Sequence, residues 1–141
     1  MRYSRSGHVV GDKMSGIEKR ALQVMVAIGS LVPIGAGIAG VIFGPRMLDS
    51  GLIGSADLDS HFRYLSGLLL AIGIGFASTV PAIETHRSRF RLLTGIVVIG
   101  GLGRLLSLLS IGPPSRAMTA ALVMELVVTP ALALWQGRVA R

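Results

Sequence analysis

The sequence predicts an all-α integral membrane protein, a four-helix bundle with four transmembrane helices. Its composition is the first reason: 51% of the 141 residues are hydrophobic, only 15% are charged, and the mean hydropathy is +0.67. Soluble domains are more polar than this. The second reason is that the apolar residues fall into four blocks, each close to the roughly 20 residues that a helix needs to cross about 30 Å of hydrocarbon.

The four predicted spans are residues 21–43, 65–83, 90–111 and 117–135. The polar residues 1–13 are expected to form a disordered tail, so that residues 14–141 make up the four-span domain. Met14 stands shortly before a charged flank and is a second candidate for the natural start. The first span is longer than the roughly 7–15 apolar residues of a signal peptide, which predicts a retained membrane helix.

The basic residues indicate an orientation in the membrane. Ten lie on one side of the predicted spans: Arg2, Arg5, Lys13, Lys19, Arg20, Arg87, Arg89, Arg91, Arg138 and Arg141. Three lie in the opposite connections: Arg46, Arg63 and Arg116. This asymmetry predicts a bacterial inner (plasma) membrane protein with both termini in the cytoplasm. No stretch interleaves basic and aromatic residues as a nucleic-acid groove would, so no nucleic-acid partner is expected.

Several kinds of chemistry are excluded by residue type. The chain has no Cys, which rules out disulfides, thiolate metal sites and Cys nucleophiles, and its three His residues are scattered. The glycines at 100–103 lack the Lys-Ser/Thr ending of a phosphate-binding loop. We therefore expect no metal site and no cofactor.

Aromatic residues support the span boundaries. Phe43, Phe62 and Tyr64 fall at the predicted outer ends, and Phe90 and Trp135 fall at the inner ends. This placement predicts an interfacial aromatic belt.

Small residues and prolines within the spans predict helix contacts and kinks. Small residues recur at i, i+4 in Ala36-Gly40-Gly44 and Gly67-Ala71-Gly75, a spacing that lets membrane helices approach closely. Prolines at 33, 81 and 130 each free a carbonyl one turn earlier, and hydroxyls at 30, 78 and 129 are placed to compensate for that loss.

The connection from residue 44 to residue 60 is the only sizeable loop. Ser55 or Asp57 is predicted to cap a helix that continues into the second span. Beyond the cap, Asp59 and Arg63 are spaced i, i+4. One interpretation is a solvated ion pair with His61 at the lipid headgroups. The other is a polar cluster at the mouth of a site.

Arg104 and Glu125 are ionisable residues inside the third and fourth predicted spans, where such residues suggest function. Counted from the short loop between the spans, both lie roughly 10–12 Å below the outer edge of the membrane. They are expected to turn inward and form a bidentate pair. Ser107 shares a helix face with Arg104, and Thr129 shares one with Glu125.

Two interpretations of this pair remain open. It locks the two helices in register, with Ser107 and Thr129 satisfying the remaining hydrogen bonds, or it forms a ligand-binding pocket. We favour the pocket, because a buried ion pair often adds no net stability. Four residues at or just before the outer end of the second span are candidates to close the pocket from the outer side: His61, Arg63, Tyr64 and Ser66. A carboxylate beside an arginine is expected to stay ionised, which argues against simple acid-base catalysis.

Three segments carry a resemblance to known proteins: HFRYLSG (His61–Gly67), GRLLSLL (Gly103–Leu109) and MELVVTPALALW (Met124–Trp135). From about Met14 onward, the chain resembles small bacterial four-helix inner-membrane proteins of a family of unknown function, distantly similar to DoxX-like proteins. The resemblance implies a four-helix bundle with a polar set at Arg63, Arg104 and Glu125. DoxX-like proteins are associated with redox-linked complexes, but this chain has no haem-ligand pair, so any cofactor would belong to a partner.

Three functional hypotheses follow. The first is a non-enzymatic protein that binds a small amphiphile or lipid in an outer-leaflet pocket. The second is an accessory subunit, or a homo-oligomer, that packs through a stripe of small residues in the first span: Gly35, Ala36, Gly37, Ala39 and Gly40. The third is a membrane isomerase with His61 and Glu125 as proton donor and acceptor. Binding or an accessory role is favoured over catalysis.

Overall fold

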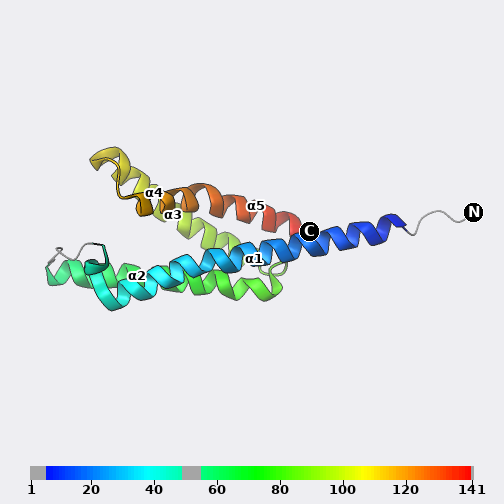
Figure 1. The fold of residues 1–141 in the computed structure, drawn as a ribbon, viewed down its shortest axis with the longest axis horizontal. Helices are drawn as coiled ribbons and strands as arrows, with labels where there is room; N and C mark the ends of the chain where they lie inside the picture. The colour runs from blue at the N-terminus through cyan, green and yellow to red at the C-terminus, as the bar shows by residue number, and fades with distance from the viewer. Residues whose placement is uncertain (1–5, 49–54, 141) are drawn as a thin grey trace, which may run out of the picture. The chain divides into compact units, whose positions relative to one another are not determined.

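The computed structural model describes residues 6–48 and 55–140, with side chains from residue 16 onward. The all-α prediction is confirmed for this part of the chain (Figure 1). The elements run in the order α1 (Ser6–Phe43), the 3-10 turn η1 (Gly44–Met47), α2 (Ala56–Thr79), the 3-10 turn η2 (Val80–Ala82), α3 (Arg87–Ile111), α4 (Arg116–Val123), the π-helical segment η3 (Met124–Val128) and α5 (Thr129–Val139).

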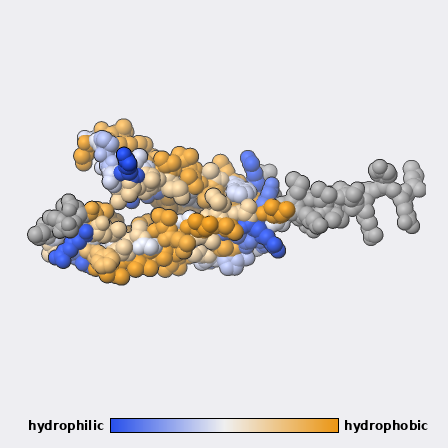
Figure 2. All heavy atoms as spheres, viewed as in Figure 1, coloured by the Kyte–Doolittle hydropathy of each residue, from blue (hydrophilic) through white to orange (hydrophobic). Residues whose placement is uncertain are grey.

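Four helical segments are long and apolar enough to cross a membrane: Gly16–Met47, Ala56–Ala82, Arg87–Ile111 and Arg116–Val139. Hydrophobic residues cover much of the visible helix surfaces, and hydrophilic residues gather near helix ends (Figure 2). The segments correspond to the four predicted spans, so the chain has the elements of a multi-pass membrane protein. Their packing as a single bundle stays a prediction.

Two helix starts differ from the predicted spans. Helix α1 begins at Ser6, within the residues predicted to form a tail, while residues 1–5 lie outside the described residues. The division of the chain near Met14 stays a prediction. Helix α2 begins at Ala56, well before residue 65, because the Ser55 side chain accepts a hydrogen bond from the Leu58 N–H at 3.3 Å. Ser55 is thus the cap expected from the sequence.

The chain divides into two compact units, and the second, residues 25–80, pairs the later part of α1 with α2. Three contacts define the pairing: a Cβ added at Gly37 would overlap Leu70, one at Gly40 would overlap Ser66, and one at Gly73 would overlap Ile34. Positions advance along α1 as they recede along α2, so the two helices are antiparallel. Glycine at each contact brings the backbones together.

These contacts correct two predictions about small residues. In the first span, Gly37 and Gly40 face α2, so these two members of the stripe predicted to meet a partner pack within the chain, whereas an added Cβ at Gly35 would meet nothing within 4 Å. In α2 the predicted Gly67-Ala71-Gly75 face is wrong at Gly67, where an added Cβ would meet nothing within 4 Å. The contact row runs instead through Ser66, Leu70 and Gly73, because a glycine on one helix leaves room for a larger side chain on the other.

Gly44 is the described glycine of this unit that also has a backbone conformation favouring glycine. Its φ is +62°, and an added Cβ would lie 2.5 Å from Asp59 Oδ1. We expect Gly44→Ala to destabilise the unit by about 1–2 kcal/mol from the backbone conformation, with a further cost from displacing Asp59. Thermal unfolding in detergent micelles measures this. Gly67→Ala is the matched control, and equal melting temperatures for the two variants would contradict the assignment.

The first unit comprises residues 1–24 and 81–141. Helix α3 runs along α4, η3 and α5, and Gly101 lets it approach η3 so closely that an added Cβ would lie 2.7 Å from Leu126 Cδ2. Leu22 of α1, Ile83 and Phe90 are fully buried. The prediction that Phe90 belongs to the interfacial belt is therefore wrong, because the described chain covers its ring completely.

The three prolines have different local consequences. Pro33 lies within continuous α1, whereas Pro81 falls in the 3-10 turn η2 and Pro130 follows the π-helical η3. The nearby hydroxyls donate to carbonyls two residues before those that the prolines free: Ser30 to Ala27, Ser78 to Gly75 and Thr129 to Met124.

Candidate functional site

Arg104 of α3 and Glu125 of η3 form an ion pair, as the sequence predicts. Arg104 Nε donates to Glu125 Oε1 at 3.0 Å. Gly101, one turn before Arg104, makes this possible, because an added Cβ there would lie 3.0 Å from Glu125 Cβ. Helix α3 therefore presents a glycine and an arginine to the same turn of the neighbouring helix.

The predicted bidentate geometry is wrong. Arg104 Nη1 donates to Met118 Sδ at 3.0 Å, and Glu125 Oε2 is buried with no hydrogen-bond partner in the described chain. Met118 of α4 thus takes a guanidinium N–H that a second carboxylate oxygen would otherwise accept. A thioether is a weak acceptor, so this part of the guanidinium is poorly satisfied. The Arg104 side chain is 39% exposed and that of Glu125 is 18% exposed.

Glu125 lies in a π-helical turn that the sequence analysis did not anticipate. The N–H and the hydroxyl of Thr129 both donate to the Met124 carbonyl, five residues earlier. Pro130 follows and has no N–H of its own, which favours such a change in hydrogen-bond register. Single π-helical turns inside α-helices frequently mark functional sites. In the sequence, the signal for this turn was the position of Glu125 five residues before Pro130.

The lock interpretation loses its predicted supporting contacts. The hydroxyl of Thr129 is used by the Met124 carbonyl, and Ser107 is exposed on α3. Neither arrangement directs a hydrogen bond to the ion pair. The pair therefore retains unsatisfied polar capacity at Glu125 Oε2.

Arg63 has a structural role in the second unit. Its Nε and Nη2 donate to Asp59 Oδ2 and Oδ1 at 2.7 and 3.2 Å, which confirms the predicted i, i+4 pair. Its Nη1 donates to the carbonyls of Val41 and Ile42 near the end of α1. Terminal helix carbonyls lack partners within their own helix, so Arg63 caps α1 from α2. Its hydrogen bonds are thereby committed to the fold.

The other three candidates near the outer end of the second span differ in exposure. His61 and Tyr64 are exposed, whereas Ser66 is buried and donates to the Phe62 carbonyl at 2.8 Å. An open hollow of about 510 Å³ in this unit is lined by Ile42, Phe43, Arg46, Met47, Asp59 and Arg63. Of the four predicted residues, only Arg63 lines it. The eight candidates are thus divided between two units, and a single shared pocket stays a prediction.

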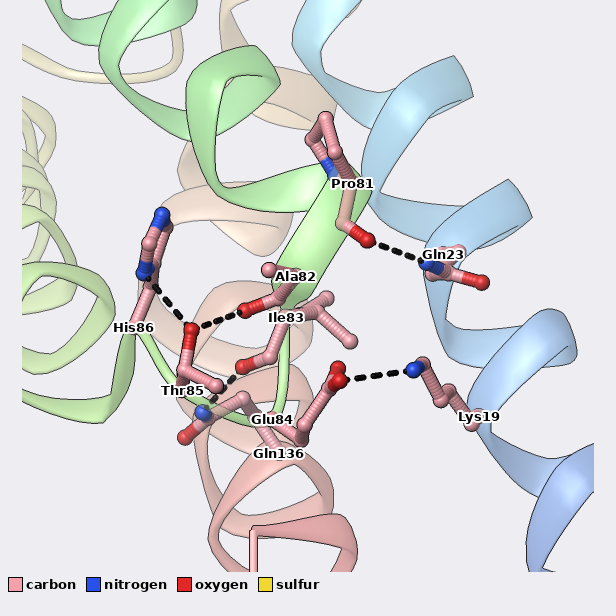
Figure 3. Close-up of polar contacts among 9 residues, drawn as sticks. All are labelled: Lys19, Gln23, Pro81, Ala82, Ile83, Glu84, Thr85, His86 and Gln136. Atoms are coloured by element: carbon pink, nitrogen blue, oxygen red, sulfur yellow. Dashed lines mark hydrogen bonds and ion pairs between the residues drawn. The ribbon is translucent and has the colours of Figure 1, made fainter.

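A polar cluster around residues 81–86 was missed by the sequence analysis (Figure 3). Lys19 Nζ of α1 lies 2.7 Å from Glu84 Oε1, and Gln136 Nε2 of α5 donates to the Ile83 carbonyl at 2.7 Å. Gln23 of α1 donates to the Pro81 carbonyl at 3.4 Å. Gln136 is fully buried. In the sequence, the signal for this cluster was the amide of Gln136, which immediately follows the fourth predicted span.

This cluster joins three segments that are distant in the sequence, which indicates a structural role. The Lys19 ammonium lowers the pKa of the Glu84 carboxyl below its ordinary value, chiefly through their hydrogen bond. Both side chains are about one-third exposed, so the pair contributes less than about 1 kcal/mol. The buried Gln136 amide is the stronger connection, since its loss would leave the Ile83 carbonyl without that donor.

The Glu84 pKa predicts acid sensitivity of the first unit. A lowered folded-state pKa contributes stability that is complete above the unfolded-state value of about 4.5 and is lost as the pH falls through the folded-state pKa. We expect Glu84→Gln to lower the melting temperature at pH 7. As the pH falls below about 4.5, the melting temperatures of the variant and of wild type should approach each other. Melting temperatures from pH 7 to pH 3 test this, with Glu18→Gln as the control. A constant difference would contradict it.

The comparisons with known proteins give a single finding. A family model described as a domain of unknown function (DUF4345) matches residues 21–136. Neither the curated proteins nor the solved structures contain a match to the chain. The matched region includes all four predicted spans and both members of the Arg104–Glu125 pair.

Proposed function

Because the chain belongs to the DUF4345 family, a domain of unknown function, we propose a function from its own residues: it binds a small amphiphile or lipid at Arg104 and Glu125. The observation that carries the proposal is the incomplete pairing of these charges. Glu125 Oε2 is buried without a partner in the described chain, while Arg104 donates one hydrogen bond to the weakly accepting thioether of Met118. The pair can therefore still accept and donate strong hydrogen bonds.

The energetics of buried charges support binding over locking. When two charges are removed from water, their attraction offsets the free energy of lost hydration only if their remaining hydrogen-bonding groups are also satisfied. Here each partner has one satisfied contact and at least one weak or missing contact. A polar headgroup that supplies the missing contacts gains more here than at an exposed surface, because the surroundings are less polarisable than water.

The location that we propose is the outer leaflet of a bacterial inner membrane, with both termini in the cytoplasm. The distribution of basic residues supports this orientation. Reporter fusions at Ser88 and at the C-terminus test it. If a reporter that works only in the periplasm is active at either position, the topology is opposite to the proposed one and the Arg104–Glu125 pair lies near the inner leaflet.

Lipid analysis of the purified protein tests the binding function. We expect wild type to retain a lipid or amphiphile through delipidation, and Arg104→Ala to lose most of it. Arg116→Ala is the matched control, because it removes the same charge from the exposed start of α4. Equal retention by all three proteins, at matched folding, would contradict binding at this pair.

A second candidate function is an accessory subunit or homo-oligomer. Four small residues on α3 are exposed at helical contact spacing: Gly100, Gly103, Ser107 and Ser110. An added Cβ at Gly100 or Gly103 would meet nothing within 4 Å. Such a face suits close helix packing in a membrane. If it is used, Gly103→Leu should shift the protein to a smaller species on native gels without changing lipid retention.

A further inference from the structure

We propose that the headgroup taken by the Arg104–Glu125 site is zwitterionic: a phosphate diester oriented toward Arg104 and a primary ammonium oriented toward Glu125, as in a phosphoethanolamine lipid. This inference rests on the proposed function and specifies its ligand. It follows from which atoms of the pair remain available and from the net charge of the pair.

Arg104 offers the phosphate subsite. Its described hydrogen bonds are those of Nε to Glu125 and Nη1 to the Met118 sulfur. A phosphate oxygen is a far stronger acceptor than a thioether and binds guanidinium N–H groups in pairs. The Arg104 side chain is 39% exposed, so its outer edge is accessible to a headgroup. Exchange of Met118 Sδ for a phosphate oxygen requires no break in the ion pair.

Glu125 offers the ammonium subsite. An ionised carboxylate only accepts hydrogen bonds, and Oε2 has no donor in the described chain. Oε2 itself is closed to solvent and only 18% of the Glu125 side chain is exposed, so a donor reaches this oxygen only when the neighbouring side chains shift, and a compact group requires the smallest shift. A primary ammonium is compact and carries three N–H donors. A trimethylammonium group is larger and has none, so it cannot satisfy this oxygen.

Charge balance separates the zwitterion from anionic lipids. Arg104 and Glu125 together carry no net charge, and neither does a phosphoethanolamine headgroup. Binding therefore leaves the site neutral, with each ligand charge beside a protein charge of opposite sign. An anionic headgroup such as that of phosphatidylglycerol can pair with Arg104 and offers only neutral hydroxyl donors to Glu125, so it adds an uncompensated charge, which is costly away from water.

Native mass spectrometry of the delipidated full chain with a graded set of lipids tests the proposal. The set is phosphatidylethanolamine, its N-methyl and N,N-dimethyl forms, and phosphatidylcholine, all with the same acyl chains. The first three keep at least one N–H and the last has none. We expect affinity to fall about tenfold or more at the last methylation, since a charged hydrogen bond is lost there. Phosphatidylglycerol should bind more weakly than phosphatidylethanolamine.

Variants assign the two subsites. Glu125→Gln should bring the ratio of phosphatidylethanolamine to phosphatidylcholine binding close to one, while Arg104→Gln should lower the binding of both lipids at least about tenfold. Arg116→Gln is the control and should leave wild-type affinities. The lipid series on wild type remains decisive even if a variant fails to fold. Soluble glycerophosphoethanolamine is added as a competitor. If it competes as effectively as the lipid, the site recognises the same headgroup, but the ligand is a water-soluble molecule.

The possible failures are distinguishable. If both lipids depend on Arg104 but phosphatidylethanolamine and phosphatidylcholine bind wild type equally, or phosphatidylglycerol binds best, the zwitterionic assignment is overturned and the lipid-binding function stands. If no lipid binding depends on Arg104 or Glu125, the proposed function fails as well.

Discussion

Glu125→Ala is expected to destabilise the protein by about 3–5 kcal/mol, more than Arg104→Ala does, because it leaves a guanidinium unpaired within the apolar span. An arginine side chain cannot shed its charge, whereas a carboxylate left alone in hydrocarbon can neutralise itself by binding a proton. The cost of the Arg104 substitution is reduced accordingly. This asymmetry is specific to a pair that lies away from water.

Unfolding in detergent or lipid nanodiscs measures the two single variants and the Arg104→Ala/Glu125→Ala double variant. The double variant should be more stable than Glu125→Ala alone, because no charge is left unpaired. A double-mutant cycle with strictly additive effects would show that the two side chains do not interact. Arg116→Ala again controls for removal of an arginine.

Phe90→Ala is expected to cost about 3–5 kcal/mol in the same assay. Phe90 is fully buried in the first unit together with Leu22 and Ile83, so truncation removes a ring from a closed environment and leaves a cavity. Leu92→Ala is the matched control on the same helix, because Leu92 is 66% exposed and its truncation opens no cavity. It should change stability by much less.

This comparison tests whether the burial of the Phe90 ring stabilises the first unit. A loss for Phe90→Ala no larger than that for Leu92→Ala would contradict the expected contribution of the ring. A large difference supports a packed core at this end of the first unit. The Gln136–Ile83 hydrogen bond lies in the same core, so Gln136→Leu should share part of the effect.

Residue type and spacing were sufficient for the features that depend on one helix or one charge pair. Long apolar blocks predicted the four candidate spans, since hydropathy and length are properties of each segment alone. The Ser55 cap and the Asp59–Arg63 pair were also predictable, because their partners lie within one helical turn. The Arg104–Glu125 contact followed from equal distances to a short connecting loop.

Other features depended on the second partner of a contact, which the sequence does not identify. Phe90 looked interfacial from its position, but packing in the first unit buries it. Arg63 looked available to a ligand, but the end of α1 takes its Nη1. The cluster at residues 81–86 was missed because Lys19, Glu84 and Gln136 are far apart in the chain.

The sequence by itself determined the helical class, the four apolar spans and the presence of two opposite charges within them. Only the tertiary structure decided how that pair is satisfied: Met118 takes one guanidinium N–H, the π-helical turn occupies the Thr129 hydroxyl, and Glu125 Oε2 is left without a partner in the described chain. The physical reason is that hydropathy and local spacing act along one segment, whereas hydrogen-bond satisfaction depends on side-chain geometry between segments.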